Sequence, residues 1–319
     1  MSYHRLIEIT DEVRAEVSGP DLDQKDMEYC VLSAQTELRA IVASNPKLKM
    51  KFAQWMAKDI EPSVREALSQ NQSIDPQIIE ELAQDSNLAV ISGAASNPNL
   101  NPERLSVLAN HRSYIVRNEI ARNSKAPLAV LERLAQDSEW GVRRSVATNL
   151  NATKELLSNL SNEEVPEIQL AVAENPVTSM ETLRTLWNTV PNTRRTVVEN
   201  PNCTEEFLLN AIEEALKLQT DQDESWDDDL KGDTNIREAI AQRTNISRAL
   251  IQKLINDPSH YVRKYLAENN QLTESDLAVL ALDADENVRQ AVVENPNTSS
   301  ESKAAATLLG LPERDSSDE

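Results

Sequence analysis

The sequence predicts an all-α fold: a right-handed α-solenoid (superhelix) of about ten 26-residue two-helix repeats. Three observations favour it. An asparagine recurs every 26 residues through much of the chain, and an arginine stands six residues before most of these asparagines. Aromatic residues make up only 3 % of the 319 residues, and there are only 5 glycines. Self-similarity at a fixed period of roughly 20–50 residues indicates stacked units, each burying its apolar face against its neighbours.

The first helix of each unit is predicted to begin four residues after the asparagine. Most units carry a good N-cap residue there, whose side-chain oxygen can accept from a free N–H of the first turn. These residues are Asp75, Asn101, Thr153, Ser179, Thr204, Ser247, Thr273 and Ser299. Apolar residues follow 8, 11 and 12 positions after the asparagine, as in Leu131, Leu134 and Ala135. That spacing forms one buried stripe on a helix of two to three turns.

The second helix carries its own apolar stripe, such as Val142, Val146 and Ala147, and is predicted to end at the asparagine. Since Asn tolerates the left-handed backbone conformation, we expect it to cap the helix in that conformation, and the proline that often follows prevents continuation. The recurring positions are Asn45, Asn71, Asn97, Asn123, Asn149, Asn175, Asn200, Asn269 and Asn295, with Arg243 as the counterpart after an insertion.

The arginine of each unit is predicted to belong to a charge-assisted ladder. It occupies positions 39, 65, 117, 143, 194, 237, 263 and 289, whereas Ile91 and Gln169 replace it in two units. An acidic residue often stands six positions before it, as Asp59 precedes Arg65, and would lie at the turn facing that arginine. An arginine row that grips phosphates is the alternative, but the accompanying acid would neutralise it.

These motifs resemble the leucine-rich repeat variant family within the broader HEAT-like α-solenoids. One unit shows the pattern as Leu131-x-x-Leu134-Ala135-x-Asp137 followed by Val142-Arg143-x-x-Val146-Ala147-x-Asn149. The resemblance covers roughly residues 38–309 and implies the architecture, while such repeats serve many functions. The family's repeats are typically shorter, so both helices here are expected to be fully α. A family member carries a cysteine-bound iron–sulfur cluster; this chain has only Cys30 near its start, so no cofactor is expected.

The predicted domains are an N-terminal helical cap over 1–37, the solenoid over 38–311 and a disordered acidic tail over 312–319. A helix is expected from about residue 21 to 44; it begins in the cap, and its far end supplies the first arginine position, Arg39. An acidic loop insertion is expected at about 219–235, with Trp226 as its one apolar contact residue. The aspartates of this loop superficially resemble a calcium loop, but Trp226 and Gly232 stand where the required Gly and Glu belong.

Neither catalysis nor a metal site is expected. The three histidines are far apart, Cys203 occupies a buried apolar slot of the repeat, and no phosphate-binding loop or nucleophile motif occurs. The chain shows no secretory signal or long apolar run, so a cytoplasmic protein without membrane contact is expected. The net charge of −21 disfavours general nucleic-acid binding, although residues 104–195 carry a net charge of +2.

One candidate site stands out, where exposed aromatic and arginine side chains are expected together, as at interface hot spots. Tyr114 and Trp140 share one phase in adjacent units and could form one patch, or merely cover the edges of the array. The candidate partner-binding residues are Tyr114, Trp140, Arg112, Arg122, Arg144, Arg195 and Trp226.

The first hypothesis is a non-catalytic scaffold or adaptor that binds a protein partner on the solenoid surface, as a monomer or in a partner-dependent complex. A basic segment of that partner is one candidate contact. The alternative is action on nucleic-acid machinery, either as a DNA mimic or as a HEAT-like DNA-binding or repair protein.

Overall fold

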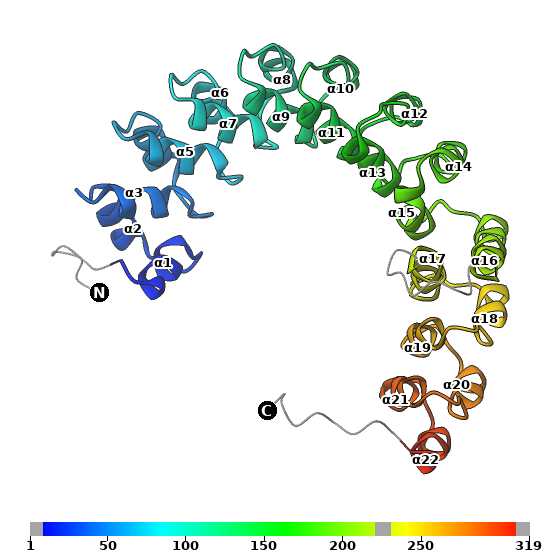
Figure 1. Cartoon of the computed structure of the whole chain (residues 1–319). Helices are drawn as coiled ribbons and strands as arrows, with labels where there is room; N and C mark the ends of the chain where they lie inside the picture. Colours follow the sequence, from blue (N-terminus) through cyan, green and yellow to red (C-terminus); the bar gives the residue numbers. More distant parts are fainter. Residues whose placement is uncertain (1–8, 221–230, 311–319) are drawn as a thin grey trace. The chain divides into compact units, whose positions relative to one another are not determined.

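The computed structural model describes residues 9–220 and 231–310, and every regular element in these two ranges is a helix (Figure 1). The predicted all-α solenoid is confirmed, because short helices follow one another in pairs and pack in order along the chain. The chain divides into two compact units, Met1–Val177 and Thr178–Glu319. The number of repeats, about ten, stays a prediction.

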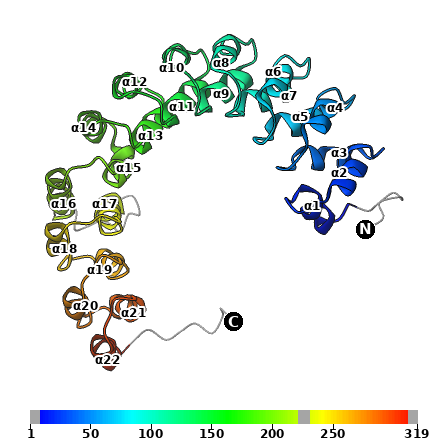
Figure 2. The same cartoon turned by 180° about the vertical axis from the view of Figure 1, so that it is seen from behind.

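The first unit consists of two rows of helices. We call the first helix of each repeat an A helix and the second, which ends at the recurring asparagine, a B helix. The helices of this unit are α1 (Asp11–Ser18), α2 (Gln24–Val31), α3 (Thr36–Ala43), α4 (Met50–Met56), α5 (Pro62–Gln70), α6 (Pro76–Leu82), α7 (Leu88–Ser96), α8 (Pro102–Leu108), α9 (Tyr114–Arg122), α10 (Leu128–Leu134), α11 (Trp140–Thr148), α12 (Lys154–Leu160) and α13 (Pro166–Glu174). The B helices from α3 to α13 contact one another in sequence and form one row, seen from both sides in Figures 1 and 2.

The second unit has the same alternation. Its elements are α14 (Met180–Thr189), the 3₁₀ helix η1 (Pro191–Thr193), α15 (Arg194–Glu199), α16 (Glu205–Thr220), α17 (Lys231–Ala241), α18 (Arg248–Leu254), α19 (His260–Ala267), α20 (Glu274–Leu280), α21 (Glu286–Glu294) and α22 (Ser300–Leu308). The B helices α15, α17, α19 and α21 pack in sequence. Apart from η1, the described elements are α-helices, as expected.

The acidic insertion needs corrected bounds. Residues 219–220 belong to α16 and residues 231–235 to α17, so both ends of the expected loop are helical. The A helix continues past its usual length because Glu213-Glu214-Ala215-Leu216-Lys217 are strong helix formers, with Ala215 buried. Trp226 and the remaining residues 221–230 lie outside the described residues.

The expected helix from about 21 to 44 is in fact two helices, α2 and α3, separated by a turn. In the turn, Ser33 Oγ accepts from the N–H of Gln35 at 3.1 Å, and Arg39 Nη1 donates to the Ser33 carbonyl at 2.9 Å. These bonds hold the chain in a non-helical conformation just where the repeat needs its A helix to turn into its B helix. The cap therefore follows the repeat more closely than its sequence indicates.

The N-caps and the apolar stripes are confirmed. Asp75, Asn101, Thr153, Ser179, Thr204, Ser247, Thr273 and Ser299 all accept a backbone N–H of the first helical turn. Most stripe residues of both helices are buried, as Leu131, Leu134, Val142 and Val146 are in one repeat, whereas Ala135 is partly exposed. Within each compact unit, each repeat thus contributes to an apolar core that it shares with its neighbours.

The recurring asparagines do not adopt the left-handed conformation expected from the sequence. Asn123 has φ −67° and ψ 124°, and no described residue other than a glycine has a positive φ. Instead its Nδ2 donates to the carbonyls of Ala95 and Asn97 in the preceding repeat, at 2.7 and 3.1 Å, while its Oδ1 accepts from the N–H of Lys125 at 2.8 Å. The buried side chain therefore fastens one repeat to the previous one.

We call this arrangement the asparagine ladder. The Nδ2 atom reaches back 28 and 26 residues at Asn45, Asn71, Asn97, Asn123, Asn149, Asn175, Asn269 and Asn295. The acceptors of Asn45 are the carbonyls of Val17 and Gly19, so the ladder extends into the N-terminal cap. After the insertion, Arg243 replaces the asparagine, and its Nη1 donates to the carbonyls of Val198 and Asn200.

The charge-assisted ladder is also present, with a different pairing from the one expected. Arg117 donates from Nε and Nη2 to both carboxylate oxygens of Asp137, 20 residues later, at 2.6 and 2.8 Å. Its Nη1 donates to the backbone carbonyl of His111, six residues earlier, at 2.9 Å. We call this the arginine ladder. Its pairs are Arg39–Asp59, Arg65–Asp85, Arg117–Asp137, Arg143–Glu163, Arg237–Asp257 and Arg263–Asp283.

The arginine ladder is interrupted at α7. Ile91 stands at the arginine position of this helix, and His111 stands at the position of its acidic partner. His111 still makes the bond within its own turn, because its Nδ1 accepts from the N–H of Ser113 at 3.1 Å. Asp137 accepts in the same way from the N–H of Glu139. The charged link between these two repeats is replaced by burial of Ile91.

Candidate functional site

The two aromatic residues singled out in the sequence are exposed on adjacent B helices. Tyr114 is the first residue of α9 and is 54 % exposed, and Trp140 is the first residue of α11 and is 49 % exposed. Leu88, the first residue of α7, shares their phase and is 38 % exposed. We call Leu88, Tyr114 and Trp140 the apolar row. These three residues lie on neighbouring helices, because α7, α9 and α11 pack in sequence.

Three of the candidate arginines belong to the first unit. All three are exposed: Arg112 lies in the turn before α9, Arg122 at the end of α9, and Arg144 in α11. Arg195 is also exposed but belongs to α15 of the second unit, where its Nε is 3.0 Å from Glu199 Oε1. Trp226 lies outside the described residues. The row and the first three arginines therefore form the part of the candidate site that the first unit holds.

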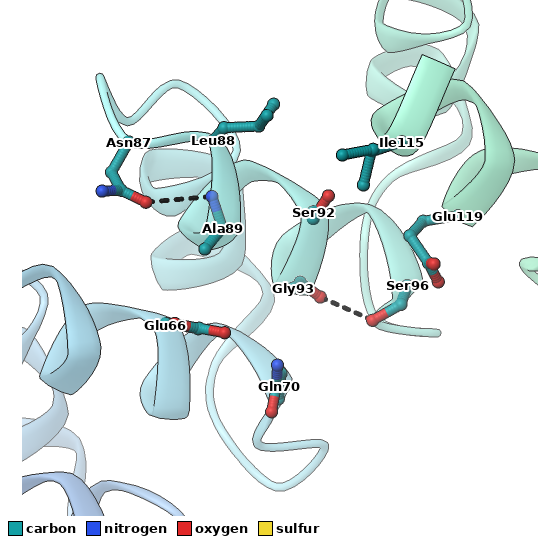
Figure 3. A pocket seen from close by; sticks show the side chains of 10 residues that line it. All are labelled: Glu66, Gln70, Asn87, Leu88, Ala89, Ser92, Gly93, Ser96, Ile115 and Glu119. Carbon is teal, nitrogen blue, oxygen red and sulfur yellow. Dashed lines mark hydrogen bonds between the residues drawn. The ribbon is translucent and has the colours of Figure 1, made fainter. Parts of the chain in front are cut away.

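Sequence reasoning missed a pocket beside Leu88. The pocket has a volume of about 640 Å³ and is open to solvent. Its lining residues come from α5, α7 and α9, or from the turn before α7: Glu66, Gln70, Asn87, Leu88, Ala89, Ser92, Gly93, Ser96, Ile115 and Glu119. Figure 3 shows Leu88 and Ile115 on one side and Glu66 and Gln70 on the other, with Ser92, Gly93 and Ser96 of α7 between them. We call this the α7 pocket.

The pocket exists because α7 carries small side chains where its neighbours carry long ones. Its sequence LAVISGAAS contains no charged residue, unlike every other B helix in the described residues. Gly93 also lets α5 and α7 approach closely, since a Cβ there would lie 2.0 Å from Ser69 Oγ. The small side chains of α7 therefore form the bottom of the pocket, and the longer side chains of α5 and α9 form its sides. The absence of charged residues from this one B helix was the feature of the sequence that could have indicated the pocket.

The walls of the α7 pocket carry negative charge. Glu66 on α5 and Glu119 on α9 are both partly buried, and neither forms an ion pair within residues 9–220 and 231–310. By contrast, the arginines of the neighbouring repeats already bind the carboxylates of the arginine ladder. The hydroxyl of Ser92 is screened from water and has no hydrogen-bond partner in the described part of the chain. The pocket therefore combines an apolar side with uncompensated polar groups.

Both cysteines are buried. Burial, the largest influence, raises the pKa of the Cys30 thiol to about 12 and that of Cys203 to about 11, so neither forms a thiolate readily near neutral pH. Among the described residues, no group of three His, Cys, Asp or Glu side chains is placed to hold a metal ion. In the same part of the chain, no helix has the length and apolar character needed to cross a membrane.

No family model and no curated protein matches the chain. Among solved structures, it is similar to a leucine-rich repeat variant with a novel repetitive structural motif, at 21 % identity over 55 % of this chain and 82 % of that one, with a TM-score of 0.31. It is also similar to a designed armadillo repeat protein, at 14 % identity over 90 % of this chain and 98 % of that one, with a TM-score of 0.12. Neither likeness bears on function at these scores. The class of protein, an all-α solenoid, is defined by the helices and ladders themselves.

Proposed function

We propose that the chain is a non-catalytic scaffold that binds a protein partner across the apolar row of the first unit. The observation that carries the proposal is the exposure of Leu88, Tyr114 and Trp140 at one phase of three adjacent helices. Aromatic and arginine side chains dominate binding energy at protein interfaces, and both kinds are present here. Solitary exposed apolar residues are common on protein surfaces, whereas a row of large ones indicates a contact surface.

The nucleic-acid alternative has weaker support. Six arginines are held by carboxylates of the arginine ladder, Arg117 and Arg143 among them, and so have reduced capacity to bind phosphates. Arg112, Arg122 and Arg144 are exposed, and a gel shift with duplex DNA at low salt tests whether they bind phosphates. Competition between this protein and duplex DNA for a DNA-binding protein tests mimicry. We expect no shift and no competition.

The scaffold proposal predicts that Tyr114→Ala with Trp140→Ala abolishes partner binding and leaves folding almost unchanged. Exposed side chains contribute little to stability, so the free energy of unfolding is expected to change by no more than about 0.5 kcal/mol for each substitution. The measurement is affinity purification from the native host, with mass spectrometry, alongside a melting curve followed by circular dichroism. Proteins bound by the wild type should be absent with the double variant.

A matched control removes two apolar side chains that are exposed on A helices, Val107 on α8 and Leu128 on α10. Val107→Ala with Leu128→Ala should retain every partner. A large loss of helical signal in the Tyr114 and Trp140 variant would show these residues to be part of the core. Retention of the same partners by both double variants would place the contact surface elsewhere.

A further inference from the structure

We infer that the α7 pocket receives the side chain of a lysine or arginine from the protein partner. This inference rests on the proposed function, because it assigns part of the same contact surface. The occupant is identified by charge and shape, from residues on three adjacent B helices.

The shape of the pocket suits a long side chain with an apolar stem. Lysine and arginine bury their methylene groups along apolar surface while the charged head binds polar groups. In the pocket, Leu88 and Ile115 offer that surface on one side, above the small residues of α7 (Figure 3). A large aromatic ring would also find apolar contacts here, but it would leave the carboxylates on the walls without a partner.

The charge of the pocket selects a cation. Glu66 and Glu119 come from the helices on either side of α7, and both are partly buried without an ion pair in the described residues. A carboxylate withdrawn from water is stabilised by a nearby cation more strongly than an exposed one, since the effective dielectric is lower. Gln70 and Ser96 add side-chain oxygens that can accept from an ammonium or guanidinium group.

The pocket is continuous with the apolar row. Leu88 belongs to both, and Ile115 of the pocket follows Tyr114 of the row directly in α9. A partner segment that lies on Tyr114 and Trp140 therefore reaches the rim of the pocket at Leu88. A basic side chain at that point of the segment would enter the pocket while its apolar neighbours contact the row.

The test uses the full chain and a phage-displayed library of random 12-residue peptides. Selected peptides should contain a lysine or arginine beside apolar residues, and their binding should be lost with Tyr114→Ala and Trp140→Ala. For one selected peptide, Glu66→Gln with Glu119→Gln should weaken binding at least tenfold. Replacing the basic residue of the peptide by alanine should have a similar effect. The two changes together should cause little more loss than either alone, which is the signature of direct contact.

A matched control, Glu132→Gln with Glu155→Gln, removes the same charge from exposed positions on the A helices α10 and α12 and should leave affinity unchanged. Peptides that bind the row but lack a basic residue, or that bind the Glu66 and Glu119 variant normally, would overturn the pocket assignment and leave the scaffold proposal standing. Additive losses in the double change would also overturn it. A library that yields no binder to the row would contradict both.

Discussion

At the scale of single residues, the solenoid depends on buried side chains that bond to the backbone of another repeat. A buried asparagine offers two donors and an acceptor, and each ladder position uses all three. The two carbonyls that it binds both lie at the C-terminal end of the preceding B helix, where the last carbonyls have no partner within their helix. One side chain therefore satisfies three backbone groups, and this explains why the residue recurs where so much else varies.

Asn123→Ala is expected to destabilise the first unit by about 2–4 kcal/mol, because it leaves two buried carbonyls and one N–H short of a partner. Asn123→Asp keeps the oxygen that accepts from the N–H of Lys125 but loses the Nδ2 donor. Its carboxylate would therefore face the carbonyl oxygens of Ala95 and Asn97. Burial raises the pKa of such a group in the folded state, so this variant should lose further stability as the pH rises above about 4. Urea unfolding at pH 4 and pH 7 checks both results. An alanine variant within 0.5 kcal/mol of the wild type would contradict the role of the ladder.

The arginine ladder makes stability depend on acid pH. For Asp137, burial is the largest influence and raises the pKa, but the bonds from Arg117 and from the N–H of Glu139 outweigh it and lower the pKa below 3.8. A lowered folded-state pKa means that the stabilisation is complete above the unfolded value and is lost as the pH falls through the folded one.

Asp137→Asn should therefore cost about 2 kcal/mol at pH 7, and the difference from the wild type should shrink steadily below about pH 4. Glu132→Gln, which removes an exposed carboxylate from α10, serves as the control and should show almost no effect at either pH. Chemical unfolding at pH 7, 4 and 3 measures both differences. A cost that persists unchanged at pH 3 would mean that the ion pair is not its source.

At the scale of the helices, the spacing of α5 and α7 is set by one glycine. Gly93 faces Ser69 and Gln70 of α5, and a Cβ would lie 2.0 Å from Ser69 Oγ and 3.1 Å from Gln70 Cγ. Gly141 in α11 is the opposite case, because nothing lies within 4 Å of the place where its Cβ would be. The same substitution should therefore have opposite effects in two B helices of one unit.

Gly93→Ala is expected to destabilise the chain by about 1–3 kcal/mol, because α5 and α7 must move apart. Gly141→Ala is expected to stabilise it by about 0.5 kcal/mol, because alanine loses less backbone entropy in a helix. Thermal unfolding of the two variants measures the contrast, and Ser69→Gly in the Gly93→Ala background should restore part of the loss. Equal effects of the two alanines would show that helix propensity, rather than packing, governs both sites.

At the scale of the whole molecule, the repeat phase predicted most of the fold and, within the candidate site, the exposure of Tyr114 and Trp140 on adjacent helices. Caps, apolar stripes and the burial of Cys203 all follow from position within the 26 residues, because a periodic array gives equal positions equal surroundings. The bonding partners of Asn123 and Arg117 could not be predicted in this way, because local rules favour bonds within a repeat. The actual bonds cross to another repeat, the preceding one for Asn123 and the following one for Arg117. The α7 pocket was missed because it depends on small residues in one helix and long ones in two others.

The asparagine ladder has a consequence for how the length of such a chain can change. Every ladder asparagine meets the same two backbone oxygens, whatever the side chains of the preceding unit. If a gene lost or duplicated 26 codons within the regular stretch, the asparagine after the junction would still find two carbonyls at the end of the preceding B helix. The register would be kept even though the sequence at the junction was new. Growth by whole repeats is thus tolerated by the backbone. Even after the 17 surplus residues before Arg243, the equivalent two carbonyls, those of Val198 and Asn200, receive a side-chain donor.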